Sequence, residues 1–271
     1  DEELSNFGYS FQPTNWNGVY DGLITPREAI MYSKNITSLK VVYNLGLSTA
    51  LEYGRKAGLI YNSESEKSIA TLALGEFNND PYDRDGGNTT ILASAYGAFG
   101  NNGVKTEAIL YTKVIDSTGK VILDKTADTT KLFSEETAYI MYDILKGPVT
   151  GFDAGGAKFG DIPVAGKSGT TDNSDSFWFS GLTPYYSASV WIGYDMPTKL
   201  NGYSSSAASL WGDVMGVVHE GLPYKEIEKP NKVVTANVCR DSGKLATDLC
   251  AQDQRGSRVR TEYFIEGTQP T

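Results

Sequence analysis

Three β-rich runs follow one another in the second half of the chain, and they limit its possible folds more than any other feature. They read IPVAGKSGTT from Ile162, SFWFSGLT from Ser176 and YSASVWIGYD from Tyr186. The links between them are short and rich in turn-forming residues, whereas a parallel crossover needs a dozen or more residues. We therefore predict an antiparallel meander of three strands.

Helical patterns precede and follow this predicted sheet. In the first, Thr25 can act as the cap, Pro26 suits the first helical position and Glu28 completes a capping box. We expect this helix to end near Ser33. Further helices are expected over ITSLKVVYNLG, STALEYGRKAG, NTTILASAYGAFGNNG, SEETAYIMYDILKGP and SAASLWGDVMGVVHEG, and a hairpin over AILYTKVIDSTGKVILD. Helices around a clustered antiparallel sheet predict an α/β or α+β enzyme domain.

This domain should extend over residues 1–222, because the sequence beyond it becomes more polar and less periodic. Within the domain, the helix that begins after Ser134 should end at Gly147-Pro148, since a proline breaks the helical hydrogen-bond pattern. Residues 223–271 are interpreted as a small C-terminal extension.

The extension contains the two cysteines of the chain, Cys239 and Cys250, with ten residues between them. That spacing fits no common zinc site, and with one histidine in the whole chain we expect no metal. A Cys239–Cys250 disulfide is favoured, which would indicate an oxidising compartment. Two unrelated free thiols are the alternative.

The charge and hydropathy of the chain exclude two classes of function. The net charge is −9, and a general nucleic-acid binder needs clustered Lys and Arg for phosphate contacts. Nothing resembles the run of about 18 apolar residues that spans a membrane, and the first residues lack the pattern of a secretion signal. Any such segment is expected outside this chain.

Lys167 stands in the stretch VAGKSGTTDNSDSFWFSG, where Gly166-Lys167-Ser168 looks like the end of a phosphate-binding loop. Such a loop requires four residues between its glycines, and Gly160 and Gly166 have five between them. The loop must also begin a helix, whose N-terminus binds the phosphate, and here strand-forming aromatic residues follow instead. A nucleotide site is therefore rejected.

An exposed edge strand explains the same residues better. There the Lys167 ammonium and the hydroxyls of Ser168, Thr170 and Thr171 would face a cleft, and Gly169 would let a ligand approach the backbone. A cation beside hydroxyls suits a substrate carboxylate, and the strand edge can hold an extended peptide.

A second polar group, Ser33-Lys34-Asn35, lies at the corner between two predicted helices. Taken alone it is a weak signal, because such triplets are common in turns and Asn35 could simply cap the next helix. The combination is more specific, since Lys-Ser-Gly-Thr-Thr follows about 130 residues later on a predicted strand.

These motifs resemble two of the three signatures of penicillin-recognising serine enzymes, S-x-N and K-T-G, although Ser168 replaces the usual Thr and keeps a hydroxyl. The chain resembles, over nearly its whole length, the transpeptidase domain of a bifunctional (class A) penicillin-binding protein. ILASAYGAFGNNG and PVAGKSGTTDNSDSFWFSGLTPYYSASVWIGYD resemble other parts of that domain. The resemblance implies a penicillin-binding/β-lactamase-like fold, an antiparallel sheet flanked by helices and incomplete at its N-terminus.

The first signature, S-x-x-K with the nucleophilic serine, is missing. The one S-x-x-K of the chain runs from Ser117 to Lys120 in a predicted hairpin turn, where Gly119 would break a helix. The family spacing puts the nucleophile upstream of Asp1, so we interpret the chain as a fragment that is inactive alone. A different serine hydrolase is not favoured, because G-x-S-x-G is absent and His219 fits a structural role at a helix end.

The resemblance also implies a role for each site residue. Ser33 would relay a proton to the leaving amine, helped by Lys167, which keeps the site electropositive. Asn35 would bind the acyl-side amide. Ser168 and Thr170 would bind the terminal carboxylate, and the Thr170 N–H would belong to the oxyanion hole.

Lys34 is expected to point to solvent or to a structural partner. The acidic loop with Asp80, Asp83 and Asp85 is interpreted as solvated in preference to a cation site.

The function implied is a D,D-transpeptidase that cross-links the D-Ala-D-Ala ends of peptidoglycan stem peptides to an acceptor amine and is inhibited by β-lactams. The alternatives are a D,D-carboxypeptidase or β-lactamase on the same scaffold, and a non-catalytic penicillin-recognising module.

No cofactor is expected. The resemblance places the protein at the outer face of the bacterial cytoplasmic membrane, with a membrane anchor and a glycosyltransferase domain upstream. An N-terminal fragment of the same protein could be a partner.

Overall fold

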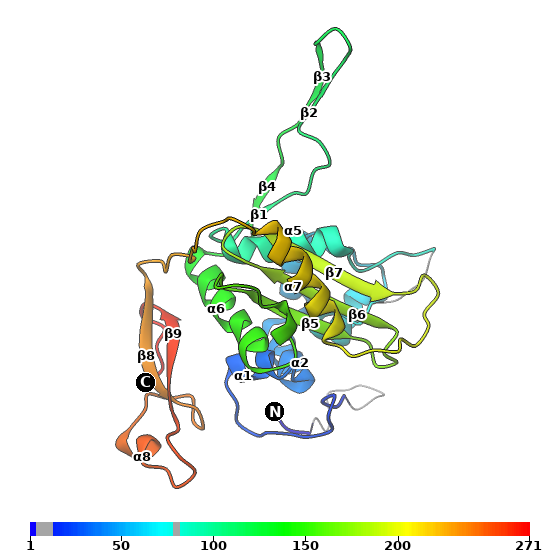
Figure 1. Ribbon diagram of the computed structural model, residues 1–271. Coiled ribbons are helices and arrows are strands. Elements are labelled where there is room, and N and C mark those ends of the chain that lie inside the picture. The colour runs from blue at the N-terminus through cyan, green and yellow to red at the C-terminus, as the bar shows by residue number, and fades with distance from the viewer. Residues whose placement is uncertain (4–12, 78–81) are drawn as a thin grey trace.

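The computed structural model describes residues 1–3, 13–77 and 82–271, and its centre is a three-stranded sheet with helices on both faces (Figure 1). The strands are β5 (Ala165–Thr170), β6 (Ser176–Leu182) and β7 (Ser187–Gly193), in the order β5-β6-β7. Both pairings are antiparallel. The predicted meander is confirmed, and β5 lies at the edge of its sheet.

One face of the sheet packs against helix α7 (Ser206–Val218). Phe177 and Phe179 of β6 are buried there, and the Phe179 ring meets the Trp211 ring edge to face with centroids 5.3 Å apart. The Trp211 indole donates a hydrogen bond of 3.0 Å to the Ala188 carbonyl. Because aromatic side chains bury large apolar areas, this cluster holds the sheet against α7.

The other face is covered by α5 (Thr89–Gly100) and α6 (Glu135–Gly151), capped by Asn88 and Ser134. The predicted end of α6 at Gly147-Pro148 is wrong, because the helix continues through Pro148 to Gly151. Proline removes one ladder hydrogen bond, but here it is buried beside the core residue Val149. Burial of the ring and of the following turn offsets the lost bond.

Short helices form the region before α5. They are α1 (Pro26–Met31), α2 (Asn35–Leu45), α3 (Leu47–Ala57), the 3₁₀ turn η1 (Ser65–Lys67) and α4 (Ile69–Leu74). The capping box of α1 is confirmed: the Thr25 hydroxyl accepts from the Glu28 N–H, and the Glu28 carboxylate accepts from the Thr25 N–H. The sequence did not predict α4, which packs on α2 through Ile69.

A β arm projects from the body between α5 and α6 (Figure 1). It consists of β1 (Val104–Thr106) paired with β4 (Thr129–Lys131), and β2 (Lys113–Ile115) paired with β3 (Val121–Asp124). The Asp116 carboxylate accepts from the N–H groups of Thr118 and Lys120 and so closes the outer turn. Ser117 therefore lies in a hairpin turn, as predicted, and not at the start of a helix.

The C-terminal extension is a hairpin of β8 (Val233–Cys239) and β9 (Val259–Ile265), with the short helix α8 (Asp248–Ala251) in its connection. Cys239 and Cys250 are free thiols in this structure. The neighbouring Cys250 side chain lowers the pKa of the Cys239 thiol. The disulfide stays a prediction.

Ion pairs attach the extension to the body. The Arg27 guanidinium of α1 lies 2.6 Å from the Asp143 carboxylate of α6 and 2.8 Å from the Glu262 carboxylate of β9, and all three side chains are largely buried. Arg240 pairs in the same way with Glu28. One buried guanidinium thus joins three elements that are distant in sequence. In the described ranges, no helix is long and apolar enough to span a membrane.

We predict that Arg27→Ala destabilises the fold by about 2 kcal/mol, because it removes the guanidinium that pairs with two largely buried carboxylates. Within the described residues, Asp143 then keeps only Lys146, 3.8 Å away, and Glu262 keeps only Arg260, 3.1 Å away. Urea unfolding followed by circular dichroism measures the change. Arg255→Ala is the matched control, since this arginine is exposed and its ion pairs are screened by water, so we expect no measurable change. Equal stability of the two variants would contradict the joining role of Arg27.

Candidate active site

Ser33 lies at a tight corner between α1 and α2 in a left-handed backbone conformation, with φ of 54°. Its N–H donates to the Ile30 carbonyl, and the next N–H, that of Lys34, donates to Ala29. A left-handed conformation is unfavourable for a residue with a side chain, and such strain concentrates at functional sites. The corner therefore presents the Ser33 side chain in an orientation that a regular helix would not provide.

Lys34 points inward at this corner. Its ammonium lies 2.5 Å from the Asp21 carboxylate and 3.7 Å from that of Asp1, and it donates to the Val19 carbonyl. Its side chain is buried, so the expectation that it could reach solvent is wrong and the structural-partner alternative is correct. Burying this cation between carboxylates holds the preceding loop against the corner.

Asn35 is the first residue of α2, and Lys34 occupies the cap position without a capping side chain. The Asn35 side-chain amide donates to the Thr14 carbonyl, 3.0 Å away. The interpretation of Asn35 as a simple helix cap is therefore wrong. Its amide instead joins the corner to the segment that precedes α1.

The third-motif residues line the free edge of β5. The Lys167 ammonium donates to the Ser168 carbonyl at 2.9 Å and lies 3.3 Å from the Ser168 hydroxyl, which donates to the Asp153 carboxylate at 2.7 Å. Burial lowers the pKa of Lys167, and the negative charge of Asp153 opposes that shift. The arrangement keeps an ammonium in a partly desolvated position with one carboxylate beside it.

Thr170 and Thr171 differ in their surroundings. Thr170 is exposed at the end of β5. The Thr171 hydroxyl donates to the Asp175 carboxylate at 2.5 Å and accepts from the N–H groups of Asp175 and Ser176. Thr171 thus closes the turn between β5 and β6, and sequence reasoning did not foresee this use of its hydroxyl. Gly169 faces Trp178 across the pairing.

The loop after α6 connects the second and third motifs. The Phe152 ring meets the ring of Tyr32, the neighbour of Ser33, edge to face with centroids 5.5 Å apart. The next residue, Asp153, binds Ser168. Sequence reasoning missed both, since a single Phe-Asp pair in a glycine-rich loop carries no periodic or motif signal.

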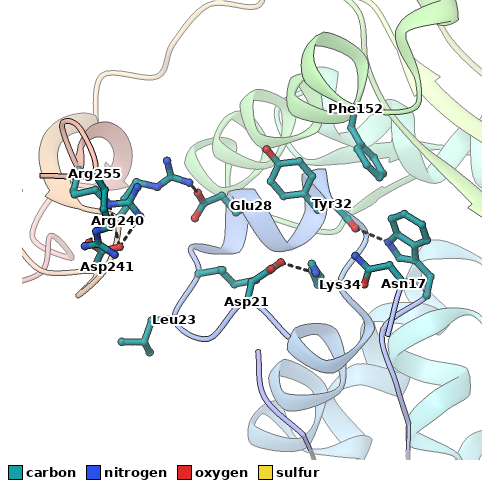
Figure 2. Close-up of a pocket in the computed structure, with 13 residues that line it drawn as sticks. Asn17, Asp21, Leu23, Glu28, Tyr32, Lys34, Phe152, Arg240, Asp241 and Arg255 are labelled. Carbon is teal, nitrogen blue, oxygen red and sulfur yellow. Dashed lines mark hydrogen bonds and ion pairs between the residues drawn. The ribbon is translucent and has the colours of Figure 1, made fainter. Parts of the chain in front are cut away.

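A cavity of about 620 Å³ lies beside the second motif, between α1 and the C-terminal extension (Figure 2). Tyr32, Lys34 and Phe152 form one wall and Arg240 and the neighbouring extension residues another. Figure 2 shows Arg240 facing Glu28 and Asp21 facing Lys34, so the charged groups of these walls are paired with each other. The third-motif strand does not line this cavity.

The remaining sequence candidates have other surroundings. His219 is buried at the end of α7, where its ring contacts the Thr183 hydroxyl at 2.8 Å and the Met215 carbonyl at 2.7 Å, which confirms a structural role. Asp83 is exposed and Asp85 half-buried, and Asp80 lies outside the described residues. A turn and a second strand follow β5, which confirms the rejection of a phosphate-binding loop.

Comparison with known families agrees with this geometry. The family described as "Penicillin binding protein transpeptidase domain" matches residues 1–216. The chain belongs to the penicillin-binding protein transpeptidase family. The family described as "Penicillin-binding protein 1A, C-terminal domain" matches residues 229–271. The resemblance expected from the two motifs is confirmed, and the boundary after residue 222 stays a prediction that falls between the two matches.

Similar proteins carry the name penicillin-binding protein 1A. The one from Clostridium perfringens is 52% identical over 272 residues, which cover this whole chain and 33% of that relative. The one from Clostridium botulinum (strain Langeland) is 49% identical over 266 residues, which cover 97% of this chain and 31% of that relative. The chain therefore spans about a third of the length of the curated relatives it matches.

A solved structure shares the fold. The crystal structure of penicillin-binding protein 1A from Haemophilus influenzae aligns with a TM-score of 0.77 at 21% identity, over 100% of this chain and 44% of that chain. At this identity the likeness concerns the fold alone, and it confirms the expected fold class of a penicillin-binding transpeptidase domain.

We predict that Ser33→Gly is more stable than Ser33→Ala by about 1 kcal/mol, because glycine adopts the left-handed conformation without the steric cost of a Cβ. Both changes remove the same hydroxyl, so the difference reports the backbone alone. Urea unfolding measures it. The same pair at Ser38, inside α2, should show the opposite order, since alanine favours a regular helix. A more stable alanine variant at position 33 would contradict the inference that the Ser33 backbone is strained.

Proposed function

We propose that this chain contains the C-terminal part of a D,D-transpeptidase domain that cross-links peptidoglycan stem peptides through an acyl-serine intermediate and that β-lactams acylate. One observation carries the proposal: an ammonium beside hydroxyl groups on a free strand edge, connected through one loop to a strained Ser-x-Asn corner. The family membership of the chain and the name of its relatives support it.

In the proposed reaction, a serine supplied from outside this chain attacks the carbonyl carbon of the penultimate D-Ala. The C–N bond to the terminal D-Ala breaks, and the proton that the attacking serine gives up is relayed through Ser33 to that leaving amine. An amine from a second stem peptide then attacks the acyl ester, which forms the new amide bond and returns the serine hydroxyl. A β-lactam follows the first half only, because its leaving amine stays attached.

The other residues bind and orient the substrate. Lys167 keeps the site electropositive and supports the proton transfer through Ser33, and Asn35 binds the acyl-side amide. The Thr171 N–H donates across the sheet to Ser176, so strand alternation directs the Thr170 N–H to the free edge. That geometry supports the Thr170 N–H as an oxyanion donor, a contribution worth about 3–4 kcal/mol in known sites. The remaining residues of the third motif are Ser168, Gly169 and Thr171.

The setting of the whole protein is part of the proposal. We infer a bifunctional protein with a membrane anchor and a glycosyltransferase domain, acting at the outer face of the cytoplasmic membrane on peptidoglycan. The support is that relatives named penicillin-binding protein 1A are about three times as long as this chain. An extracytoplasmic location also suits the proposed Cys239–Cys250 disulfide.

We predict that Lys167→Ala in the full-length protein slows acylation by fluorescent penicillin by about 10²–10⁴-fold, the usual contribution of a proton-transfer group. Gel fluorescence over time measures the rate. Lys199→Ala, an exposed lysine beyond β7, is the matched control and should label at the normal rate. The isolated chain should not label at all. Full labelling of Lys167→Ala would refute the proposed role of Lys167.

The products formed from stem peptides test the alternative activity. Hydrolysed instead of cross-linked products would indicate a carboxypeptidase.

A further inference from the structure

The proposed function assigns no role to Asp153, although its carboxylate hydrogen-bonds Ser168 of the third motif. Its Oδ2 atom accepts the Ser168 hydroxyl hydrogen at 2.7 Å, and the same hydroxyl oxygen lies 3.3 Å from the Lys167 ammonium. Lys167, Ser168 and Asp153 therefore form a continuous series: cation, hydroxyl, carboxylate. Such a series aligns each group, because the hydroxyl accepts from one side and donates to the other.

The second oxygen of the Asp153 carboxylate makes the arrangement more unusual. Oδ1 is buried, and within the described part of the chain it has no hydrogen-bond partner. Burying half of a carboxylate without a hydrogen bond is unfavourable unless a nearby charge offsets the lost hydration. Lys167 is the charge that offers this compensation.

The loop that holds Asp153 is itself well anchored. The Phe152 ring contacts the rings of Trp16 and Tyr32, and the Ala154 N–H donates to the Pro148 carbonyl of α6. Ala154 is fully buried, and the 3₁₀ turn η2 (Gly155–Ala157) follows and packs against α7. Asp153 is therefore held in place by its neighbours on both sides.

We propose that Asp153 is a positioning residue of the active site, which anchors the Ser168 hydroxyl and holds the Lys167 ammonium in its charged form. This inference rests on the proposed function and deepens it. A serine hydroxyl has one hydrogen, and Ser168 donates it to Asp153. Ser168 thus belongs to the support of Lys167, and recognition of the substrate carboxylate falls to the exposed Thr170.

The pH dependence follows from the charges around Lys167. Lys167 interacts electrostatically with Asp153 on the loop after α6. The residue opposite Lys167 on β6 is Ser180, which does not titrate. Burial lowers the pKa of Lys167 and the Asp153 charge raises it. Removal of that charge therefore lowers the pKa further, so the ammonium is lost at a lower pH. An activity that needs the ammonium then declines earlier as the pH rises.

The first test is the pH profile of penicillin acylation in the full-length protein. Asp153→Asn keeps an oxygen that can accept from Ser168 but removes the charge, and we expect the alkaline limb to move down by about one pH unit. Ser168→Ala removes the hydroxyl and keeps the charge, so its alkaline limb should stay at the wild-type position while its acylation slows. Thermal unfolding of each variant verifies the fold.

The second test separates the roles of the two hydroxyl residues and does not require Asp153→Asn to fold. Acylation by benzylpenicillin is compared with acylation by its methyl ester, which lacks the carboxylate charge. Thr170→Val should lose most of the wild-type preference for the free acid. Ser168→Ala should retain that preference within about twofold, although its rate is lower.

The outcomes distinguish this inference from the proposed function. A wild-type protein that penicillin does not acylate would defeat the function itself. A wild type that is acylated, together with an Asp153→Asn alkaline limb at the wild-type position, would overturn the positioning role. Loss of the free-acid preference in Ser168→Ala would equally overturn it, because Ser168 would then bind the carboxylate directly.

Discussion

The packing of α6 between α1 and β5 is the constraint on which the rest of the structure depends. The two motifs of the site lie about 130 residues apart, and both reach the same helix and the loop that ends it. Arg27 joins α1 to Asp143 of α6, and the loop after α6 touches Tyr32 on one side and Ser168 on the other. A shift of this helix would therefore move both halves of the site.

Two lysines, the buried Lys34 and the half-buried Lys167, have different electrostatic roles in the site. Lys34 lies within 4 Å of two carboxylates and serves to hold the corner, whereas Lys167 has one carboxylate nearby and keeps access to the strand edge. Both must be compensated, because a buried ammonium without an anion tends to lose its proton. The difference in compensation separates a structural cation from one suited to proton transfer.

Local rules predicted much of the fold. The Thr25 capping box, the hairpin turn at Asp116 and the three-strand meander each depend on residues close in sequence, and all three agree with the structure. The predicted end of α6 disagrees with the structure, because burial of Pro148 outweighs its local helix-breaking effect. In the site, the motif residues were predicted, but the turn contacts of Thr171 and the contribution of Asp153 were not.

The sequence by itself determined the family, the residue types of both motifs and the strand that carries Lys167. These follow from short patterns whose physical causes, capping, turn formation and side-chain alternation, act within a few residues. Only the tertiary structure decided that Lys34 is buried, that Ser33 is strained and that Ser168 binds Asp153. Desolvation and ion pairing depend on groups that folding brings together from distant segments, and no local pattern records them.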